Sequence, residues 1–444
     1  MRFFKKPIFV SVSPNAECDD VWLALRLIFS PWRWQKGEAA KKLEEEFKKY
    51  LGVKFAFTFE SGRTCLYAIL MALGIRKGDE VLIQAFTCTA AVNPIIWVGA
   101  RPVYVDLEKN TYNMSPIDLE KKITPQSRVI IIQHTFGFPA KIDEILAIAK
   151  KYNLIVLEDC AHSLGATYQN QKVGTFGLAA FFSFGRSKII SSVFGGLAVT
   201  NNFELSEKIK EFHKKWPYPS NRWIAQQLFH PIYLAIAKPI YNFFNLGKLM
   251  IILCKKLGLI SIMVYSIEKS GGRPPFGPTK LPNGLAILAL NQLRKLERFN
   301  EHRRSLAKFY GRELKSLLPS LYKREEEPPP FKKEGWGGFF LPKLLSNSNP
   351  VFLNFPIQVK NFGMRRKLIG EARKNGIYLE SWPAKDKKVI GPDSVCLEKL
   401  FYTEGSCPIA EKTASQSINL PTSPNTDIKM AKRVVKFLKY FFKI

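Results

Sequence analysis

Three residues in the first half of the chain have types and positions that suit covalent chemistry. Lys188 follows the strand-like run AAFFSF (179–184) and precedes a Gly-Gly pair, in a stretch that otherwise reads as buried. Ser183 lies near the end of that run, and Asp159 ends the earlier run LIVLED (154–159). An amine can bond to a carbonyl compound, a carboxylate can hold a cation, and a hydroxyl can donate to a phosphate. Together these groups suit a phosphorylated ligand that carries a carbonyl.

A helix start farther upstream adds a candidate phosphate site. The segment FTFESGRTCLYAIL (57–70) reads as a strand, a Ser-Gly-Arg-Thr turn and a helix. Backbone amides at such a helix start, with the help of the helix dipole, form a site for a phosphate. A lysine, a carboxylate and a phosphate cradle are what pyridoxal 5'-phosphate requires. Two simpler readings stay open, in which Lys188 is a snorkelling surface residue and Asp159 is a helix N-cap.

The elements that must position these residues form an α/β pattern. Seven short apolar runs predict strands: FAFTF (55–59), EVLIQ (80–84), RPVYVD (101–106), RVIIIQH (128–134), LIVLED (154–159), AAFFSF (179–184) and GLAVT (196–200). Helical patterns between several of them indicate βαβ units and a mostly parallel seven-stranded sheet covered on both faces. We expect a large α/β domain over 1–215, an apolar and basic insertion over 216–275, and a long connecting helix with a small α+β domain over 276–444.

The charge balance and the cysteines narrow the class of protein. The formal net charge is +30, from 67 Lys and Arg against 37 Asp and Glu, which suggests an anionic partner. The chain lacks a basic arm with interleaved aromatic residues, so we expect no nucleic-acid partner. Seven cysteines without a C-x-x-C pair predict neither disulfides nor a metal site and favour the reducing cytoplasm. The first residues include only a short, broken apolar run, which predicts no signal peptide.

Residues 223–267 are apolar and aromatic, but four lysines interrupt them, so no charge-free run reaches the roughly 18 residues that a bilayer span needs. One reading is a buried helical hairpin that packs on the body or widens a dimer interface. The other is a peripheral membrane patch with an apolar face edged by lysines. The candidate patch comprises Trp223, Phe229, Tyr233, Tyr241, Phe243, Phe244, Leu249, Ile251 and Ile252, edged by Lys238, Lys248, Lys255 and Lys256.

Longer motifs make the chain similar to the DegT/DnrJ/EryC1/StrS family of pyridoxal-phosphate-dependent sugar aminotransferases. The resemblance is carried by GDEVLIQAFTCTAAVNPIIWVGARPVYVDLEKNTYNMSP, HTFGFPAKIDEILAIAKKYNLIVLEDCAHSLGA, GTFGLAAFFSFGRSK, LPNGLAILALNQLRKLERFNEHR and INLPTSPNTD. It covers most of the chain apart from the apolar insertion and a Pro-rich stretch. It implies the aspartate-aminotransferase fold (PLP fold type I), the cofactor pyridoxal 5'-phosphate, and a homodimer.

The resemblance also implies roles for single residues. Lys188 would hold the cofactor and carry a proton between substrate and cofactor carbons. Asp159 would pair with the pyridine nitrogen, and His162 would lie against the ring or its phenolic oxygen. The implied catalytic residues are Lys188 and Asp159, and the implied cofactor-binding residues are Arg63, Thr64, Cys88, Asp159, His162, Ser183 and Lys188.

Four parts of the cofactor site depart from the family pattern. Gly185 stands where the family has a histidine, and FGPTKLP (276–282) replaces the family's GYNYRM segment, which leaves Lys280 near the position of its Arg and no Asn to reach the cofactor of a neighbouring subunit. The amides of Arg63 and Thr64 and the hydroxyl of Ser183 would bind the phosphate, but Arg63 replaces the usual threonine. Cys88 stands where the family has an aromatic residue that stacks on the ring. Phe86, two residues earlier, is a candidate replacement for that aromatic residue.

The implied function is transfer of an amino group from glutamate or glutamine to a keto group of a nucleotide-linked sugar, for cell-surface polysaccharide or lipopolysaccharide biosynthesis. We expect a cytoplasmic enzyme, with peripheral contact at the inner face of the membrane if residues 223–267 bind lipid. Two alternatives stay open. One is a protein of this fold with a regulatory or other non-transaminase role, and the other is an aminotransferase that acts on a lipid-linked sugar at the membrane.

Overall fold

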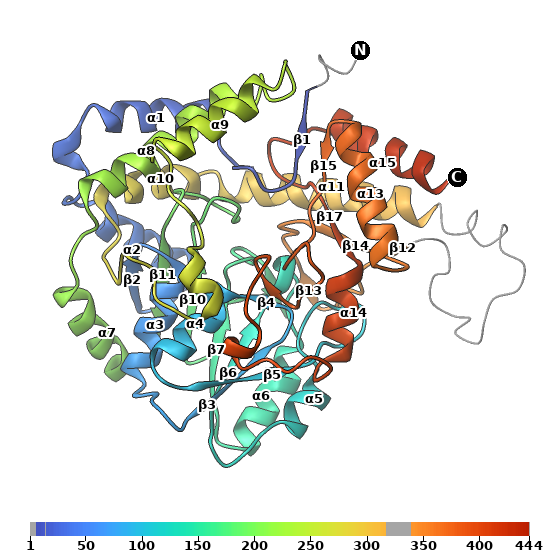
Figure 1. The fold of residues 1–444 in the computed structure, drawn as a ribbon. Helices are drawn as coiled ribbons and strands as arrows, with labels where there is room; N and C mark the ends of the chain where they lie inside the picture. The colour runs from blue at the N-terminus through green and yellow to red at the C-terminus, as the bar shows by residue number, and fades with distance from the viewer. Residues whose placement is uncertain (1–5, 14, 317–338, 444) are drawn as a thin grey trace, which may run out of the picture.

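A seven-stranded sheet organises the computed structural model, which describes residues 6–13, 15–316 and 339–443 (Figure 1). Five neighbouring strands are parallel, and β11 runs antiparallel to both of its neighbours. The strand order is β2 (Phe55–Phe59), β11 (Gly196–Thr200), β10 (Ala179–Ser183), β7 (Ile155–Asp159), β6 (Ser127–Gln133), β3 (Glu80–Gln84) and β5 (Arg101–Val105). All seven predicted strands are present, so the mostly parallel α/β sheet expected from the sequence is confirmed.

Successive side chains of a strand point to opposite faces of the sheet, so the hydrophobic core is divided between the two faces. Val81 and Ile83 of β3 pack in one hydrophobic cluster, whereas Leu82 between them belongs to another on the opposite face. Both faces are therefore covered, which is why the strands read as continuous apolar runs rather than alternating ones. The covering helices are α2 (Ala39–Leu51), α3 (Gly62–Ala72), α4 (Thr89–Trp97), α5 (Pro116–Lys121), α6 (Ile142–Lys151) and α7 (Phe203–Lys215).

The apolar insertion folds as a helical hairpin beside the N-terminal helix. α8 (Asn221–Ala237) packs on α1 (Cys18–Ile28) and on α9 (Leu246–Lys256), along the upper edge of Figure 1. A short 3-10 helix (Ser266–Ser270) then leads the chain back to the sheet domain. No helix in the described part of the chain is long and apolar enough to cross a membrane.

The hairpin combines features of both readings of residues 223–267. Trp223 and Tyr233 of the candidate patch are buried, and Lys238 donates to the carbonyl of Ser13, so α8 behaves as a packed helix. Leu249 and Ile252 of α9 are more than half exposed, at 61% and 51%. The reading as a membrane patch is therefore wrong for α8, because the apolar side chains of this helix pack on the body of the protein.

The C-terminal part contains a second, smaller sheet and its covering helices. The expected long connecting helix is divided into α10 (Asn283–Leu293) and α11 (Leu296–Lys315) by a turn at Arg294 and Lys295. The Lys295 ammonium pairs with Asp19 and Asp20 of α1. The remaining elements are β12 (Phe339–Phe340), β14 (Phe355–Val359), α13 (Phe362–Lys374), α14 (Pro408–Gln416), β17 (Ser417–Leu420) and α15 (Ile428–Phe442).

Short pairings connect distant parts of the chain. β1 (Ile8–Phe9) pairs in parallel with β15 (Ile377–Tyr378). β4 (Thr87–Cys88) pairs in parallel with β16 (Ile390–Gly391), which brings the C-terminal part beside Cys88. A third small sheet joins β8 (Thr167–Tyr168), β9 (Gln171–Lys172) and β13 (Ser348–Asn349).

Candidate active site

The carboxyl ends of three neighbouring strands form the base of the site. Asp159 at the end of β7 pairs in register with Gln133 of β6 on one side and with Phe181 of β10 on the other. Two residues farther along β10 is Ser183, and Lys188 follows in the turn after that strand. In parallel α/β sheets ligands bind beyond these strand ends. The register therefore brings the predicted acid, hydroxyl and amine to one place.

Asp159 has the environment of a buried counter-ion. Its side chain accepts from Gln133 Nε2 at 2.7 Å and from the Ala161 amide at 3.0 Å, and the residue is 7% exposed. Burial raises the pKa of the Asp159 carboxyl, while these hydrogen bonds and the nearby Lys188 charge act in the opposite direction. The bond to Ala161 caps a turn and not a helix, so the helix N-cap reading of this residue is wrong.

Lys188 is held in a well-anchored turn. Asn15 Nδ2 donates to the carbonyl oxygens of Lys188 and Ile189, at 2.6 and 2.9 Å. Arg303 in turn donates to Asn15 Oδ1 at 2.6 Å, and both Asn15 and Arg303 are fully buried. Burial lowers the pKa of the Lys188 ammonium, while Cys88 and Asp159 raise it. The sequence pattern missed Asn15 and Arg303, because neither belongs to a motif and both act on Lys188 from distant parts of the chain.

A close approach of two backbones builds the expected phosphate cradle. Gly62 begins α3 beside β10, where an added Cβ would lie 3.1 Å from Ser183 Cβ. The Ser183 hydroxyl accepts from the Gly185 amide at 3.4 Å and keeps its own proton for another acceptor. Thr64 N–H donates to the capping Ser61 Oγ at 3.3 Å, so it must exchange this partner before it can donate to a phosphate. The helix start and the Ser183 hydroxyl are nevertheless adjacent, as expected.

Glu60, which the sequence analysis did not single out, lies beside this cradle. Its carboxylate accepts from the Thr64 hydroxyl, from Ser61 Oγ at 3.2 Å and from the Thr279 amide at 3.1 Å. Burial raises the pKa of the Glu60 carboxyl, with Arg63 among the groups that lower it. An acid next to a phosphate site is electrostatically unfavourable unless it is protonated or paired with a cation.

The Arg63 side chain is held by residues at and beyond the end of the insertion's helices. It forms an ion pair with the fully buried Glu268 and donates to the Met263 carbonyl at 2.9 Å. Its guanidinium lies 5.9 Å from the centroid of the Phe276 ring. Only the backbone of Arg63 is therefore available to the cradle.

An aromatic group borders the site opposite α3. The His162 imidazole lies 5.1 Å from the Trp382 ring and is parallel to that of Phe136 at 6.3 Å. Burial and the Lys188 charge lower the pKa of His162 well below its usual value, so its ring is neutral near pH 7. Trp382 is a further residue that the sequence analysis missed, since it lies in the C-terminal part of the chain.

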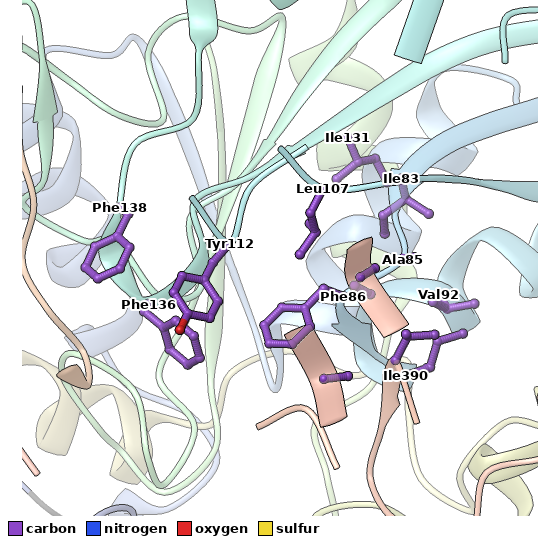
Figure 2. Packing of buried hydrophobic residues seen from close by; sticks show 14 of the residues in the cluster. Ile83, Ala85, Phe86, Val92, Leu107, Tyr112, Ile131, Phe136, Phe138 and Ile390 are labelled. Atoms are coloured by element: carbon purple, nitrogen blue, oxygen red, sulfur yellow. The ribbon is translucent and has the colours of Figure 1, made fainter. Parts of the chain in front are cut away.

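Neither Cys88 nor Phe86, the two residues considered for stacking on the cofactor ring, provides an aromatic ring at the site. Cys88 precedes α4, where burial raises the pKa of its thiol and Lys188 lowers it. Phe86 is fully buried, and Figure 2 shows its ring between Tyr112 and Phe136 on one side and Ile390 on the other. Phe86 thus belongs to the core, and the idea that it replaces the stacking aromatic finds no support.

The residues fit pyridoxal 5'-phosphate by the chemistry of their donor set. A partly buried amine of lowered pKa, a buried carboxylate beside it, and a helix start with an adjacent hydroxyl are the three groups this cofactor uses. The Asp159 oxygens retain lone pairs beyond their two hydrogen bonds, so the carboxylate can accept from a further cationic N–H. Such a cation would offset the cost of burying this carboxylate.

Comparisons with known proteins place the chain in a family. The sequence profile of the DegT/DnrJ/EryC1/StrS aminotransferase family matches residues 22–218 and 276–439. An uncharacterized protein of Methanocaldococcus jannaschii is 30% identical over 395 residues, which are 87% of this chain and 86% of that protein. GDP-perosamine synthase of Escherichia coli O157:H7 is 39% identical over 183 residues, 41% of this chain and 50% of the synthase.

A solved structure agrees with the fold. NtdA from Bacillus subtilis, whose structure holds the bound cofactor PMP, superposes with a TM-score of 0.71 at 21% identity, over 99% of this chain and 87% of that one. This superposition confirms the aspartate-aminotransferase-like fold, and the family match confirms the aminotransferase activity and the cofactor expected from the resemblance. The chain belongs to the DegT/DnrJ/EryC1/StrS family of pyridoxal-phosphate-dependent aminotransferases.

Proposed function

We propose that this enzyme transfers an amino group from glutamate or glutamine to a keto group of a nucleotide-linked sugar, for cell-surface polysaccharide or lipopolysaccharide biosynthesis. The observation that carries the site assignment is the strand register that places Lys188 beyond Asp159 and Ser183. The similarity to a GDP-perosamine synthase supports a sugar carried on a nucleoside diphosphate. The net charge of +30 suits such an anionic substrate.

Each proposed site residue has a distinct task. Pyridoxal phosphate, when bound, supplies the ring into which electrons from the substrate's carbon–hydrogen bond are drawn. Lys188 Nζ holds the cofactor at rest and then carries a proton between carbon atoms, and burial, which lowers the pKa of its ammonium, favours the free amine that both tasks need. Asp159 keeps the ring nitrogen protonated, and the neutral His162 lies against the ring. The first turn of α3 and Ser183 hold the phosphate.

The substrate class is tested with the purified full-length protein. GDP-, UDP- and dTDP-linked keto sugars are offered with glutamate or glutamine, and products are detected by mass. The expected result is an amino sugar from at least one of them, and Lys188→Ala should abolish it. Turnover of amino acids and keto acids alone, with every nucleotide sugar unchanged, would contradict the proposal.

We also propose that the chain works as a homodimer and that its parts divide at residues 215 and 275. The family membership supports the dimer, because enzymes of this class place their sites at a two-fold interface. The family match supports the division, since it stops at residue 218 and resumes at 276. Sedimentation equilibrium of the intact protein tests the dimer, and limited proteolysis tests the boundaries.

The exposed face of α9 supports peripheral contact with anionic membranes. Leu249, Leu253 and Leu257 lie four residues apart, hence on one side of the helix, and are 61%, 53% and 61% exposed. Lys255 and Lys256 are exposed at the end of the same helix. Each lysine near anionic headgroups adds about 1 kcal/mol to binding. A lipid surface is the occupant that satisfies both the leucines and these cations.

Flotation with vesicles that contain an anionic lipid tests this contact. The intact enzyme should float at low salt, and Leu249→Ser combined with Leu253→Ser should remain at the bottom of the gradient. Ile117→Ser removes an equally exposed apolar side chain far from α9 and serves as the matched control. If no form floats while the double variant loses self-association, α9 is an interface between two copies of the chain and the membrane proposal fails.

A further inference from the structure

A segment outside the family match contacts both halves of the cofactor site. Residues 261–268 follow the two helices of the insertion, which the family profile passes over between residues 218 and 276. One end of this segment reaches the turn that carries Lys188, and the other reaches the first turn of α3. We call residues 261–268 the arm.

The arm binds the first turn of α3 through Arg63. The fully buried Glu268 pairs with the Arg63 guanidinium, and the carbonyl of Met263 accepts from the same group at 2.9 Å. Glu268 is itself fixed, since its carboxylate accepts from the Tyr265 amide at 2.8 Å and its carbonyl from Asn93 Nδ2 at 2.9 Å. The charge of Arg63 is thus neutralised within the protein, one residue after the glycine that forms the cradle.

The arm binds the Lys188 turn through Arg186. Arg186 Nη2 donates to the carbonyl and the hydroxyl oxygen of Ser261, at 3.0 and 2.6 Å. The Ser261 hydroxyl donates in turn to Gln227 Oε1 of α8 at 2.7 Å. Arg186 lies in the same turn as Lys188, whose amide donates to Gly185 O at 3.1 Å. A chain of hydrogen bonds therefore runs from the helical hairpin to the turn of the reactive lysine.

We propose that the arm clamps the cofactor site and that Glu268 and Ser261 are positioning residues, which act through Arg63 and Arg186. A buried guanidinium that loses its carboxylate must find water or another acceptor, and either move displaces the backbone that carries it. The backbone in question supplies the phosphate cradle on one side and the lysine on the other. The proposal rests on the proposed function only in taking these two turns as the cofactor site.

Three variants of the full-length protein test the clamp. Glu268→Gln removes the charge that holds Arg63, and Ser261→Ala removes the hydroxyl that accepts from Arg186. Asn242→Leu is the matched control, because it removes another partly buried polar contact of the insertion, in which Asn242 Oδ1 accepts from the Tyr378 hydroxyl and not from either turn of the site. Hydrogen exchange of the cofactor-free protein and the dissociation constant of pyridoxal phosphate are measured for each.

The clamp predicts a specific pattern across these variants. Glu268→Gln should raise the dissociation constant of the cofactor about tenfold, the size of one charge-assisted hydrogen bond, and speed exchange at amides 62–66. Ser261→Ala should raise that constant about threefold and speed exchange at 185–190, and it decides the question if Glu268→Gln does not fold. Asn242→Leu should leave both regions unchanged.

Some results would contradict the clamp proposal without bearing on the proposed reaction. Equal losses of melting temperature in all three variants, with cofactor affinity and local exchange unchanged, would mean that the arm is only structural. Tighter cofactor binding in Glu268→Gln would mean that Glu268 restrains Arg63 from the phosphate rather than positioning α3. Neither readout requires sugar turnover, so a failure of the proposed substrate class is recognised separately.

Discussion

Replacing Asp159 by asparagine separates the charge of this side chain from its shape. The amide keeps one oxygen acceptor, which can remain bonded to either Gln133 Nε2 or the Ala161 amide, now 2.7 and 3.0 Å from the carboxylate. Its NH2 group then faces the other donor. One hydrogen bond is lost, but the cost of burying a carboxylate is also removed.

The expected loss of stability is smaller than the expected loss of rate. An unsatisfied buried donor costs about 1–3 kcal/mol, and the relief of burial offsets part of it, so the free energy of unfolding should fall by about 2 kcal/mol at most. Opposite unit charges in contact near a protein surface attract by about 4 kcal/mol, and every 1.4 kcal/mol is a factor of about ten in rate. We therefore expect Asp159→Asn to slow amino transfer by about three orders of magnitude.

The assay compares single-turnover rates per folded molecule with unfolding measured in denaturant. Glu158→Gln is the control, because Glu158 is the preceding residue of β7, is fully buried, and accepts from the amides of Gly174, Phe176 and Gly177. It should lose stability but keep its rate. If Asp159→Asn retains its rate within a factor of about three, the charge of Asp159 is not what the reaction uses.

Three further substitutions address the rest of the site. Lys188→Ala should fold and bind pyridoxal phosphate only exchangeably, and retention of cofactor after borohydride treatment and denaturation would refute the role of Lys188. Glu60→Gln should tighten cofactor binding, and it should abolish the loss of affinity that we expect in the parent enzyme as pH rises through the elevated pKa of Glu60, measured by titration at several pH values. Trp382→Leu should cost about 2 kcal/mol of stability and weaken cofactor binding by loosening His162, whereas an unchanged affinity would exclude that contact.

The sheet and the order of the site residues were predictable from the sequence because they are set locally. Each strand is a short apolar run, and a parallel register places the residues that follow the runs at one edge. Asp159, Ser183 and Lys188 follow from this rule alone. The start of α3 was predictable for the same reason, since Ser61 and Gly62 are typical of a helix start.

The residues that hold this frame from a distance were not predictable. Asn15 binds the turn of Lys188, which lies more than 170 positions after it in the sequence. Arg303 binds the same turn and lies more than 110 positions after that turn. Trp382 reaches His162 because β16 pairs with β4, and two-residue strands leave no periodic signal. The burial of α8 had the same cause, since an apolar helix reads alike whether its face meets lipid or protein.

The insertion leaves the body of the enzyme and returns to it at one place. Lys280 N–H donates to the Pro217 carbonyl at 2.9 Å, so residues on either side of about sixty others are hydrogen-bonded neighbours. Lengthening a chain at such a point adds little closure entropy and leaves the flanking path unchanged. An ancestral enzyme could therefore have acquired the hairpin in a single step. The exposed face of α9 can then change in sequence without altering the path of the chain on either side of the insertion.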